Sequence, residues 1–206
     1  MHHPPHILSY VKDLPNICSL AGLLCAAASL YCSSLSLYAA AVIWMLWAVL
    51  FDWADGIVAR KLKGRQPHQG SFGAQLDSMI DMISFGACPA LFLMSYGRFD
   101  PVFFPGAFII LASSALRLSY FNLYGLVDAH TYKGLALDNN IIILGAVFLL
   151  EGRLGQPLFS YLLYGLFMGL CAFNLMPVRT PKFSSRWFIP LSVYTIGLTC
   201  VYILVL

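Results

Sequence analysis

Seven long apolar stretches separated by short polar connections make up most of this 206-residue chain. A helix needs about 20 consecutive apolar residues to cross a bilayer, and most of the stretches approach that length. They cover residues 16–35, 38–60, 73–96, 102–124, 139–150, 157–173 and 188–206. Their apolar residues run continuously and do not alternate with polar ones, which is typical of membrane helices and not of barrel strands. The sequence therefore predicts an all-α polytopic membrane helical bundle with about seven spans.

The composition excludes several classes of protein. Charged residues make up 10% of the chain and hydrophobic residues 60%, whereas a soluble domain carries about 25% charged residues. A soluble enzyme, a secreted disulfide scaffold and a disordered regulator are therefore excluded, and a net charge of +3 is too small to indicate a nucleic-acid partner. We expect residues 1–206 to form a single integral membrane domain. Its fifth stretch is short, so that helix could begin nearer Lys133, and its last could be peripheral to a core of six.

The basic residues predict the orientation of the chain, because cytoplasmic loops carry an excess of Lys and Arg. If the N-terminus is inside, only Arg98 and Arg153 lie on the outer side, and ten basic residues lie on the cytoplasmic side. Those ten are Lys12, Arg60, Lys61, Lys63, Arg65, Arg117, Lys133, Arg179, Lys182 and Arg186. We therefore expect insertion in the cytoplasmic (inner) membrane, with the N-terminal segment 1–13 and the loop 61–72 in the cytoplasm.

Four of the nine acidic residues lie in the segment 52–81, which joins the second apolar stretch to the third. Asp52 and Asp55 lie three residues apart at the end of the second stretch. Asp77 and Asp81 lie four residues apart at the start of the third. Both spacings place a pair on one face of a helix, and the short connection makes the two helices antiparallel neighbours. The pattern predicts that the carboxylates converge in one pocket near the cytoplasmic surface.

These negative charges at membrane depth require a positive partner, because even one costs about 2.5–3.5 kcal/mol at a helix centre. Arg60 can neutralise one at most, so divalent cations are the simplest counter-charge. Carboxylate oxygens are hard ligands that suit Mg²⁺ or Mn²⁺, and two ions bridged by shared carboxylates would clamp a phosphate and activate a hydroxyl. The alternative is a set of helix-end acids paired with Lys61, Lys63 and Arg65 on a solvated rim. Asp81 argues against that alternative, since it lies well inside a helix that then stays apolar.

Two glycines and three tryptophans near the acids suggest contacts with a ligand or with lipid. Gly56 and Gly73 lie on the same helix faces as the acids. Glycine lets a ligand approach the backbone closely, and close packing between helices is the alternative explanation. Trp44, Trp47 and Trp53 on the second stretch are expected to contact lipid or headgroups.

The acids, the glycines and Arg60 together form a pattern that resembles the signature of the CDP-alcohol phosphotransferases. The pattern reads Asp52-x-x-Asp55-Gly56-x-x-Ala59-Arg60 and then Gly73-x-x-x-Asp77-x-x-x-Asp81. Further residues resemble the phosphatidylserine synthase branch of that family, namely Leu76-Asp77-Ser78, residues 81–86, Pro89-Ala90, residues 115–118 and Phe121-Asn122. Arg60 and Gly73 enclose twelve residues, which is longer than the usual spacing. We expect the extra residues to lengthen the cytoplasmic loop.

The resemblance implies a core of six helices, a homodimer and a defined reaction. The family moves a phosphoalcohol from a CDP-linked donor to a second alcohol. This branch implies transfer of a phosphatidyl group from CDP-diacylglycerol to L-serine within the membrane lipid. Asp52, Asp55, Asp77 and Asp81 would hold two Mg²⁺ or Mn²⁺ ions, Asp81 would also be the general base, and the CDP donor would bind Asn16, Gly56, Ala59, Arg60 and Gly73.

The sequence defines the acceptor site less closely. Serine carries a carboxylate and an ammonium group, so its pocket needs a cation near the metals. Arg117 is the first candidate, because its planar guanidinium matches a carboxylate, and Asn122 and Lys133 are second choices. The alternative is that Arg117 anchors a helix end at the membrane interface. Asp128 and Asp138 could hold the ammonium group.

Other functions stay open. Within the family, the acceptor could be glycerol phosphate or an inositol phosphate, or the donor could be an archaeal ether lipid. A dianionic acceptor would need a cluster of cations, which the fourth and fifth stretches lack apart from Arg117 and Lys133. A cation transporter or channel is an alternative from a different class. Transport would need polar residues across the whole membrane, whereas these acids stop at its cytoplasmic end.

Overall fold

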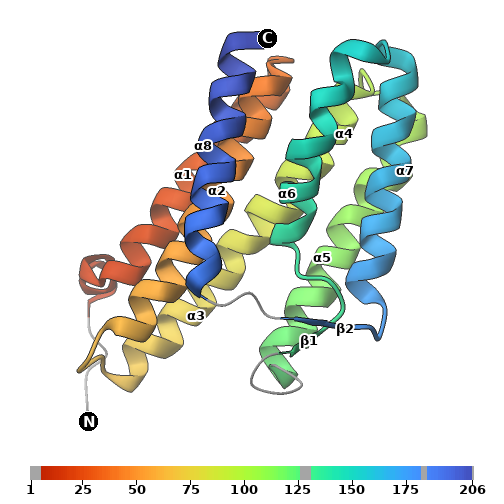
Figure 1. The fold of residues 1–206 in the computed structure, drawn as a ribbon. Coiled ribbons are helices and arrows are strands. Elements are labelled where there is room, and N and C mark those ends of the chain that lie inside the picture. The colour runs from red at the N-terminus through yellow and green to blue at the C-terminus, as the bar shows by residue number, and fades with distance from the viewer. Residues whose placement is uncertain (1–5, 126–130, 182–184, 206) are drawn as a thin grey trace.

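Helices account for most of the residues that the computed structural model describes, which are 6–125, 131–181 and 185–205 (Figure 1). In chain order the α-helices are α1 (Leu14–Ser34), α2 (Tyr38–Lys61), α3 (Pro67–Asp81), α4 (Cys88–Tyr96), α5 (Phe104–Tyr124), α6 (Asp138–Val147), α7 (Gln156–Leu175) and α8 (Phe188–Val205). Each apolar stretch predicted from the sequence therefore corresponds to a helix.

Six helical segments of the described chain are long and apolar enough to cross a membrane. They are α1, α2, α3 continued through the π-turn η2 (Met82–Ala87) into α4, α5 with the turn η3 (Pro101–Phe103) before it, α7, and α8 with the turn η5 (Ser185–Trp187). The protein is thus an integral membrane protein, and the predicted polytopic helical bundle is confirmed.

The fifth apolar stretch differs from the others, because its helix is too short to cross a membrane alone. α6 has 10 residues and continues only as the 3-10 turn η4 (Phe148–Arg153). The chain before α6 forms strand β1 (Thr131–Lys133), which pairs antiparallel with β2 (Arg179–Pro181), so the helix does not reach back to this segment. Gly134 then turns the chain at a φ of +80°, close against the backbone of Asn174. α6 consequently starts well above the lower ends of α5 and α7 (Figure 1).

Small side chains let α1 lie close along α2. Gly22, Ala26 and Ser29 are buried on α1. A Cβ atom on Gly22 would lie 3.5 Å from the Cβ atom of Phe51, and the Ser29 hydroxyl donates to the carbonyl of Ala41 at 3.0 Å. Small residues at helix contacts are typical of membrane bundles, because they let the backbones approach. This packing holds the end of α2, with its two acids, against the first helix.

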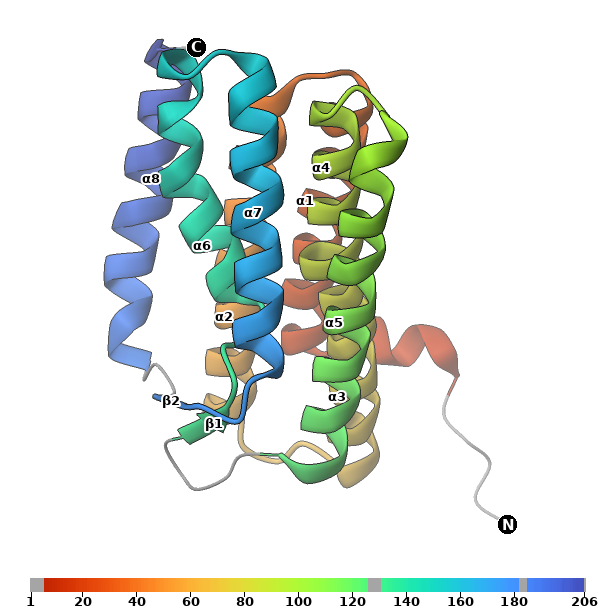
Figure 2. The ribbon, with the colours of Figure 1, turned by 90° about the vertical axis from the view of Figure 1, so that its right-hand side faces the viewer.

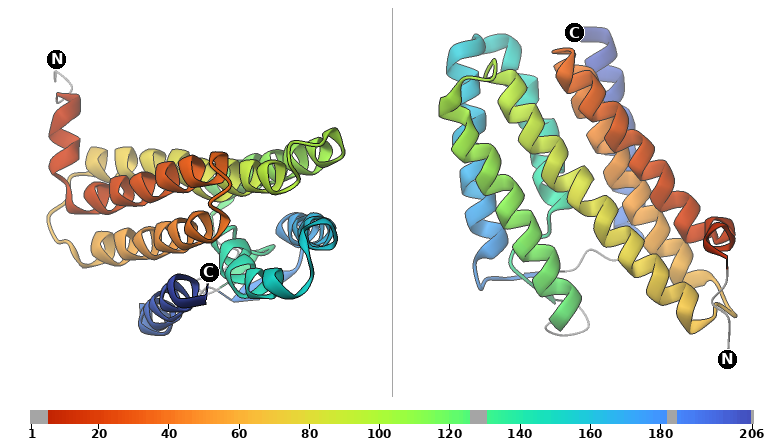
Figure 3. Two further views of the ribbon diagram at one scale, coloured as in Figure 1. Left: turned by 90° about the horizontal axis from the view of Figure 1, so that it is seen from above. Right: turned by 180° about the vertical axis from the view of Figure 1, so that it is seen from behind.

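The remaining helices surround α2 and α5. α2 contacts α6 and α8 as well as α1, and α5 contacts α4 and α7. Figure 3 shows α2 between α1 and α8, and Figure 2 shows α5 beside α7. The centre of the bundle is apolar and fully buried, with Met45 and Leu46 from α2, Phe92 from α4, Leu144 from α6 and Leu163 from α7. The polar cavity described below therefore lies beside a continuous apolar core.

The connection between α2 and α3 is shorter than predicted. α3 begins at Pro67, which suits the first position of a helix because it has no N–H group to satisfy. The side chains of Gln66 and Gln69 accept hydrogen bonds from each other's backbone N–H groups in a capping box. The predicted loop 61–72 is therefore wrong over residues 67–72, and part of the extra length between Arg60 and Gly73 belongs to the helix.

The N-terminal segment is tied to α3. The 3-10 helix η1 (Ile7–Lys12) lies crosswise to the bundle (Figure 2). The ring of Tyr10 stacks on that of Phe72 with centroids 4.1 Å apart, and Arg65 forms an ion pair with Asp13 at 2.6 Å. These contacts hold the start of α1 near the start of α3.

We predict that Gly134→Ala destabilises the protein more than Gly64→Ala does. Both glycines have a left-handed φ, +80° and +84°, which costs an L-residue about 1–2 kcal/mol. A Cβ atom at Gly64 meets nothing within 4 Å, whereas one at Gly134 would lie 2.3 Å from the carbonyl oxygen of Asn174. Thermal unfolding in detergent measures the difference, and equal losses of stability in the two variants would contradict the predicted clash.

Candidate functional site

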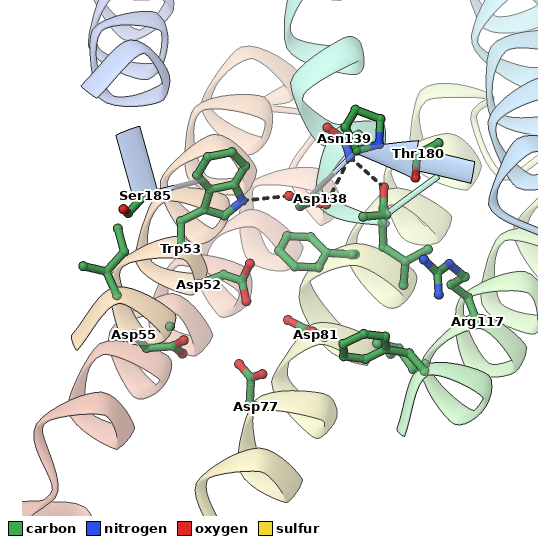
Figure 4. A pocket seen from close by; sticks show the side chains of 18 of the residues that line it. Asp52, Trp53, Asp55, Asp77, Asp81, Arg117, Asp138, Asn139, Thr180 and Ser185 are labelled. Atoms are coloured by element: carbon green, nitrogen blue, oxygen red, sulfur yellow. Dashed lines mark hydrogen bonds between the residues drawn. The ribbon is translucent and has the colours of Figure 1, made fainter. Parts of the chain in front are cut away.

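Two helices bring four aspartates to one place in the bundle (Figure 4). Asp52 and Asp55 project from the last turns of α2, and the other two, Asp77 and Asp81, project from α3. Carboxylate oxygens of Asp52, Asp55 and Asp77 all lie within 4.8 Å of one another. Asp81 lines the same cavity. The structure therefore gathers the four acids that the helical spacing predicts to converge.

No basic side chain among the described residues neutralises these carboxylates. The ion pair found within 4.0 Å in the described chain joins Arg65 to Asp13. Arg65 therefore does not pair with the clustered aspartates, as it would if they were helix-end acids on a solvated rim. Carboxylates this close repel one another when ionised. A divalent cation would remove the repulsion, and a ligand set made only of carboxylate oxygens suits Mg²⁺ or Mn²⁺. The residues present therefore fit a metal ion.

Ser19 ties the acidic cluster to the first helix. Its hydroxyl donates a hydrogen bond to Oδ2 of Asp55, and both residues are buried. A hydrogen bond to a metal-ligating carboxylate orients it and tunes its affinity for the metal. α1 therefore takes part in the site, although it carries none of the four acids.

The acids form one end of a cavity of about 230 Å³. α2, α3, η2, α5, the start of α6, strand β2 and η5 contribute side chains to its wall. Figure 4 shows Arg117, Asn139 and Thr180 on the side away from Asp55 and Asp77. The cavity thus has an acidic end and an end of mixed polarity.

Two of the five residues predicted to bind the CDP donor line this cavity. They are Gly56 and Arg60, and the guanidinium lies over the glycine, since a Cβ atom there would be 3.4 Å from Nη1. Asn16, Ala59 and Gly73 are not part of the lining. A Cβ atom on Gly73 would lie 3.0 Å from Oδ1 of Asn16. Close packing between α1 and α3 therefore accounts for Gly73, whereas Gly56 lies in the cavity wall under the guanidinium of Arg60.

One of the three residues predicted to bind the acceptor lines the cavity. Arg117 is 7% exposed, and its Nε donates to the carbonyl of Leu135 at 3.2 Å. This burial argues against a role as an anchor at the membrane interface. Asn122 and Lys133 are exposed and outside the lining, and Nζ of the lysine donates to the hydroxyl of Tyr120 at 3.1 Å.

Trp53 from α2 and Asp138 from α6 meet at the edge of the cavity (Figure 4). Nε1 of Trp53 donates to Oδ2 of Asp138 at 2.7 Å. The structure places this indole in the cavity wall, whereas the sequence suggested a lipid contact. The sequence named Asp138 only as one of two candidates for the ammonium group, and the other, Asp128, lies outside the described residues. An acidic residue near the start of an apolar run is typical of a helix start, so the sequence could indicate the position of Asp138. No pattern in the sequence near Asp138 indicates its contact with Trp53.

We predict that Ser19→Ala weakens divalent-metal binding by about 10- to 100-fold, which is the usual effect of losing an outer-shell hydrogen bond. Titration of the purified protein with Mn²⁺, followed by electron paramagnetic resonance, measures the affinity. Ser29→Ala is the matched control, because Ser29 is a buried serine of the same helix that bonds the carbonyl of Ala41. Equal affinities in the two variants would show that Ser19 has no role at the metal site.

Comparison with known proteins shows three relatives. The chain is 39% identical over 126 residues to the archaetidylserine synthase of Methanothermobacter thermautotrophicus, covering 60% of this chain and 52% of that protein. It is 31% identical over 144 residues to the CDP-diacylglycerol–serine O-phosphatidyltransferase of Methanocaldococcus jannaschii, covering 69% and 64%. It is 24% identical over 159 residues to the phosphatidylcholine synthase of Agrobacterium fabrum, covering 76% and 62%. The chain thus spans between half and two thirds of the length of these relatives.

The match to a whole family is broader than the match to any of these proteins. The sequence model of the CDP-alcohol phosphatidyltransferase family matches residues 12–173. That range includes the four aspartates, Ser19, Arg60, Arg117 and Asp138. The resemblance seen in the motif is confirmed, and the chain belongs to the CDP-alcohol phosphatidyltransferase family.

Proposed function

We propose that this protein transfers a phosphatidyl group from CDP-diacylglycerol to the hydroxyl group of L-serine, giving phosphatidylserine and CMP. The observation that carries the proposal is the cluster of aspartates at one end of a cavity inside a membrane bundle. Two relatives, an archaetidylserine synthase and a CDP-diacylglycerol–serine O-phosphatidyltransferase, support serine as the acceptor.

In this proposal Asp52, Asp55, Asp77 and Asp81 hold Mg²⁺ or Mn²⁺, and we expect two ions. Such ions, when bound, neutralise the diphosphate and lower the pKa of an alcohol. The approach of three carboxylates to within 4.8 Å supports the binding of a cation. The hydrogen bond from Ser19 supports a fixed orientation for one of them.

The donor would bind with its diphosphate beside Arg60 and its acyl chains in the surrounding lipid. The guanidinium of Arg60 lies over Gly56 in the cavity wall, where its forked N–H groups suit two phosphate oxygens. The absence of a side chain on Gly56 lets this guanidinium lie close against the helix. Asn16, Ala59 and Gly73 stay predictions for the same donor site, at the helices that border it.

Asp81 is the proposed general base. It would take the proton from the serine hydroxyl, while the serine oxygen forms a bond to the phosphorus that bears diacylglycerol. The bond from that phosphorus to CMP breaks in the same displacement. Asp81 lies on the side of the cluster that faces Arg117 (Figure 4), where a serine carboxylate would meet a matching guanidinium. Asn122 and Lys133 stay second choices for the acceptor.

A second candidate differs only in the donor lipid. The relative that is 39% identical is an archaetidylserine synthase, which favours an archaeal ether lipid as the donor. The aspartates, Arg60 and Arg117 would have the same roles with either lipid, because the CDP group is common to both. Parallel assays with ester-linked and ether-linked CDP lipids distinguish the two donors.

We further propose that the active site faces the cytoplasm from the inner membrane. The support is the excess of Lys and Arg on one side, because cytoplasmic loops are rich in these residues. Of these basic residues, Lys182 lies outside the described part of the chain. The family resemblance supports a single catalytic domain over residues 1–206 that acts as a homodimer.

We predict that the purified protein releases CMP from CDP-diacylglycerol when serine and Mn²⁺ or Mg²⁺ are present. Asp81→Asn should lower kcat by about 100- to 10,000-fold, the usual contribution of a general base. Asp100→Asn is the matched control and should keep its activity, because Asp100 accepts from the backbone N–H of Val102 at 2.9 Å and does not line the cavity.

Other results would change the proposal in defined ways. CMP release with glycerol phosphate or an inositol phosphate, but not with serine, would change the acceptor. Absence of CMP with every acceptor would contradict the enzyme, and ion flux into vesicles without CMP release would favour a transporter. Near-normal turnover in Asp81→Asn would show that another group accepts the proton.

A further inference from the structure

Asp138 is an acid of the cavity that the proposed chemistry does not use. It begins α6 and lies in the cavity wall together with Arg117. It is not part of the group in which oxygens of Asp52, Asp55 and Asp77 approach one another. A partly buried carboxylate is costly unless it is paired and hydrogen-bonded, so its presence at this place requires an explanation.

Hydrogen bonds and a nearby charge hold the carboxylate of Asp138 in place. Oδ2 accepts from Nε1 of Trp53 at 2.7 Å, and Oδ1 accepts from Nδ2 of Asn139 at a longer 3.4 Å. The backbone N–H groups of residues 138 and 139, at the start of α6, also interact with this carboxylate. Arg117, in the same cavity wall, attracts this carboxylate electrostatically.

The indole of Trp53 gives this carboxylate a fixed direction. Indole Nε1–H is a donor only, so it holds the carboxylate of Asp138 as its acceptor. Trp53 comes from α2, directly after Asp52, and Asp138 from the start of α6. Figure 4 shows the pair at the edge of the cavity, with Asp138 between Trp53 and Asn139. The carboxylate is therefore positioned by two helices that meet only in the folded bundle.

We propose that Asp138 binds the ammonium group of an amino-alcohol acceptor and thereby selects such acceptors over phosphorylated alcohols. An ammonium group carries a positive charge and three N–H donors, which suit a carboxylate that lines the cavity beside Arg117. A phosphate dianion would meet an additional negative charge at this end of the cavity and would be repelled. This inference rests on the proposed function, and it assigns the selection of the acceptor to a residue outside the aspartate cluster.

The sharpest test compares acceptors that differ by one charged group. Serine has both a carboxylate and an ammonium group, ethanolamine lacks the carboxylate, and 3-hydroxypropanoate lacks the ammonium group. Asp138→Asn keeps the shape of the side chain and removes its charge. It should raise KM for serine and ethanolamine by about 10- to 100-fold, the range for losing a hydrogen bond to a charged group, with little change in kcat. The inhibition constant of 3-hydroxypropanoate against serine should not change.

Trp53→Phe tests the positioning of the carboxylate with an independent variant. It removes the indole N–H and keeps an aromatic ring in the wall, so it should raise KM for serine by a smaller factor. Its inhibition constant for 3-hydroxypropanoate should again stay at the wild-type value. Size-exclusion chromatography shows whether each variant still folds. Asp100→Asn, which changes the same chemical group away from the cavity, should leave KM for serine as it is in the wild type.

Several results would overturn the inference. An unchanged KM for serine in Asp138→Asn would do so. An equal loss for serine and 3-hydroxypropanoate would also do so, because it would show a structural effect. A raised requirement for Mn²⁺ in that variant would instead make Asp138 a metal ligand.

The inference and the proposed function can fail separately. Calorimetric titration of the wild-type protein and Asp138→Asn with serine measures the contact even without turnover. Weaker serine binding in the variant, together with no CMP release by the wild type, would support the inference and contradict the proposed function. If the protein used choline in place of serine, the proposed acceptor would change. A similar rise of KM for choline in Asp138→Asn would still support Asp138 as the group that binds the cation.

Discussion

The close approach of several carboxylates inside a membrane bundle is the constraint on which this structure depends. Oxygens of Asp52, Asp55 and Asp77 lie within 4.8 Å of one another, and no described cation pairs with them. Separating α2 from α3 would relieve their repulsion, but the small residues of α1 and the hydrogen bond from Ser19 hold α2 in place. A bound cation would therefore stabilise the folded state as well as supply chemistry, because a ligand of the native state shifts the folding equilibrium toward it.

The second constraint is the shortness of α6. A helix that crossed the whole membrane at this place would carry its first residue away from the acids. Instead, the pairing of β1 with β2 and the turn at Gly134 delay the helix until Asp138. Asp138 then lies at the cavity, and the same turn offers its carbonyls to Arg117. The acidic end of the cavity thus comes from α2 and α3, whereas the irregular segment before α6 brings Asp138 to the end of mixed polarity.

Much of the fold follows from local pattern. The bounds of α1, α2, α5 and α7 agree with the predicted apolar stretches to within a few residues, because the length of an apolar run limits the helix that can cross the membrane. The convergence of the aspartates follows from spacings of three and four residues on neighbouring helices. The start of α3 lies before the predicted residue 73, because Pro67 begins the helix and the capping box satisfies its first turn.

The membrane helices and the two helical faces that carry the four acids can be predicted from the sequence, because each depends on the pattern along a single helix. Which other residues reach the cavity depends on how the helices pack. This packing places Arg60 and Arg117 in the lining, leaves Asn16, Gly73, Asn122 and Lys133 outside it, and joins Trp53 to Asp138. These contacts join segments as many as 85 residues apart, and such distances are set by helix packing and not by the pattern along any one helix.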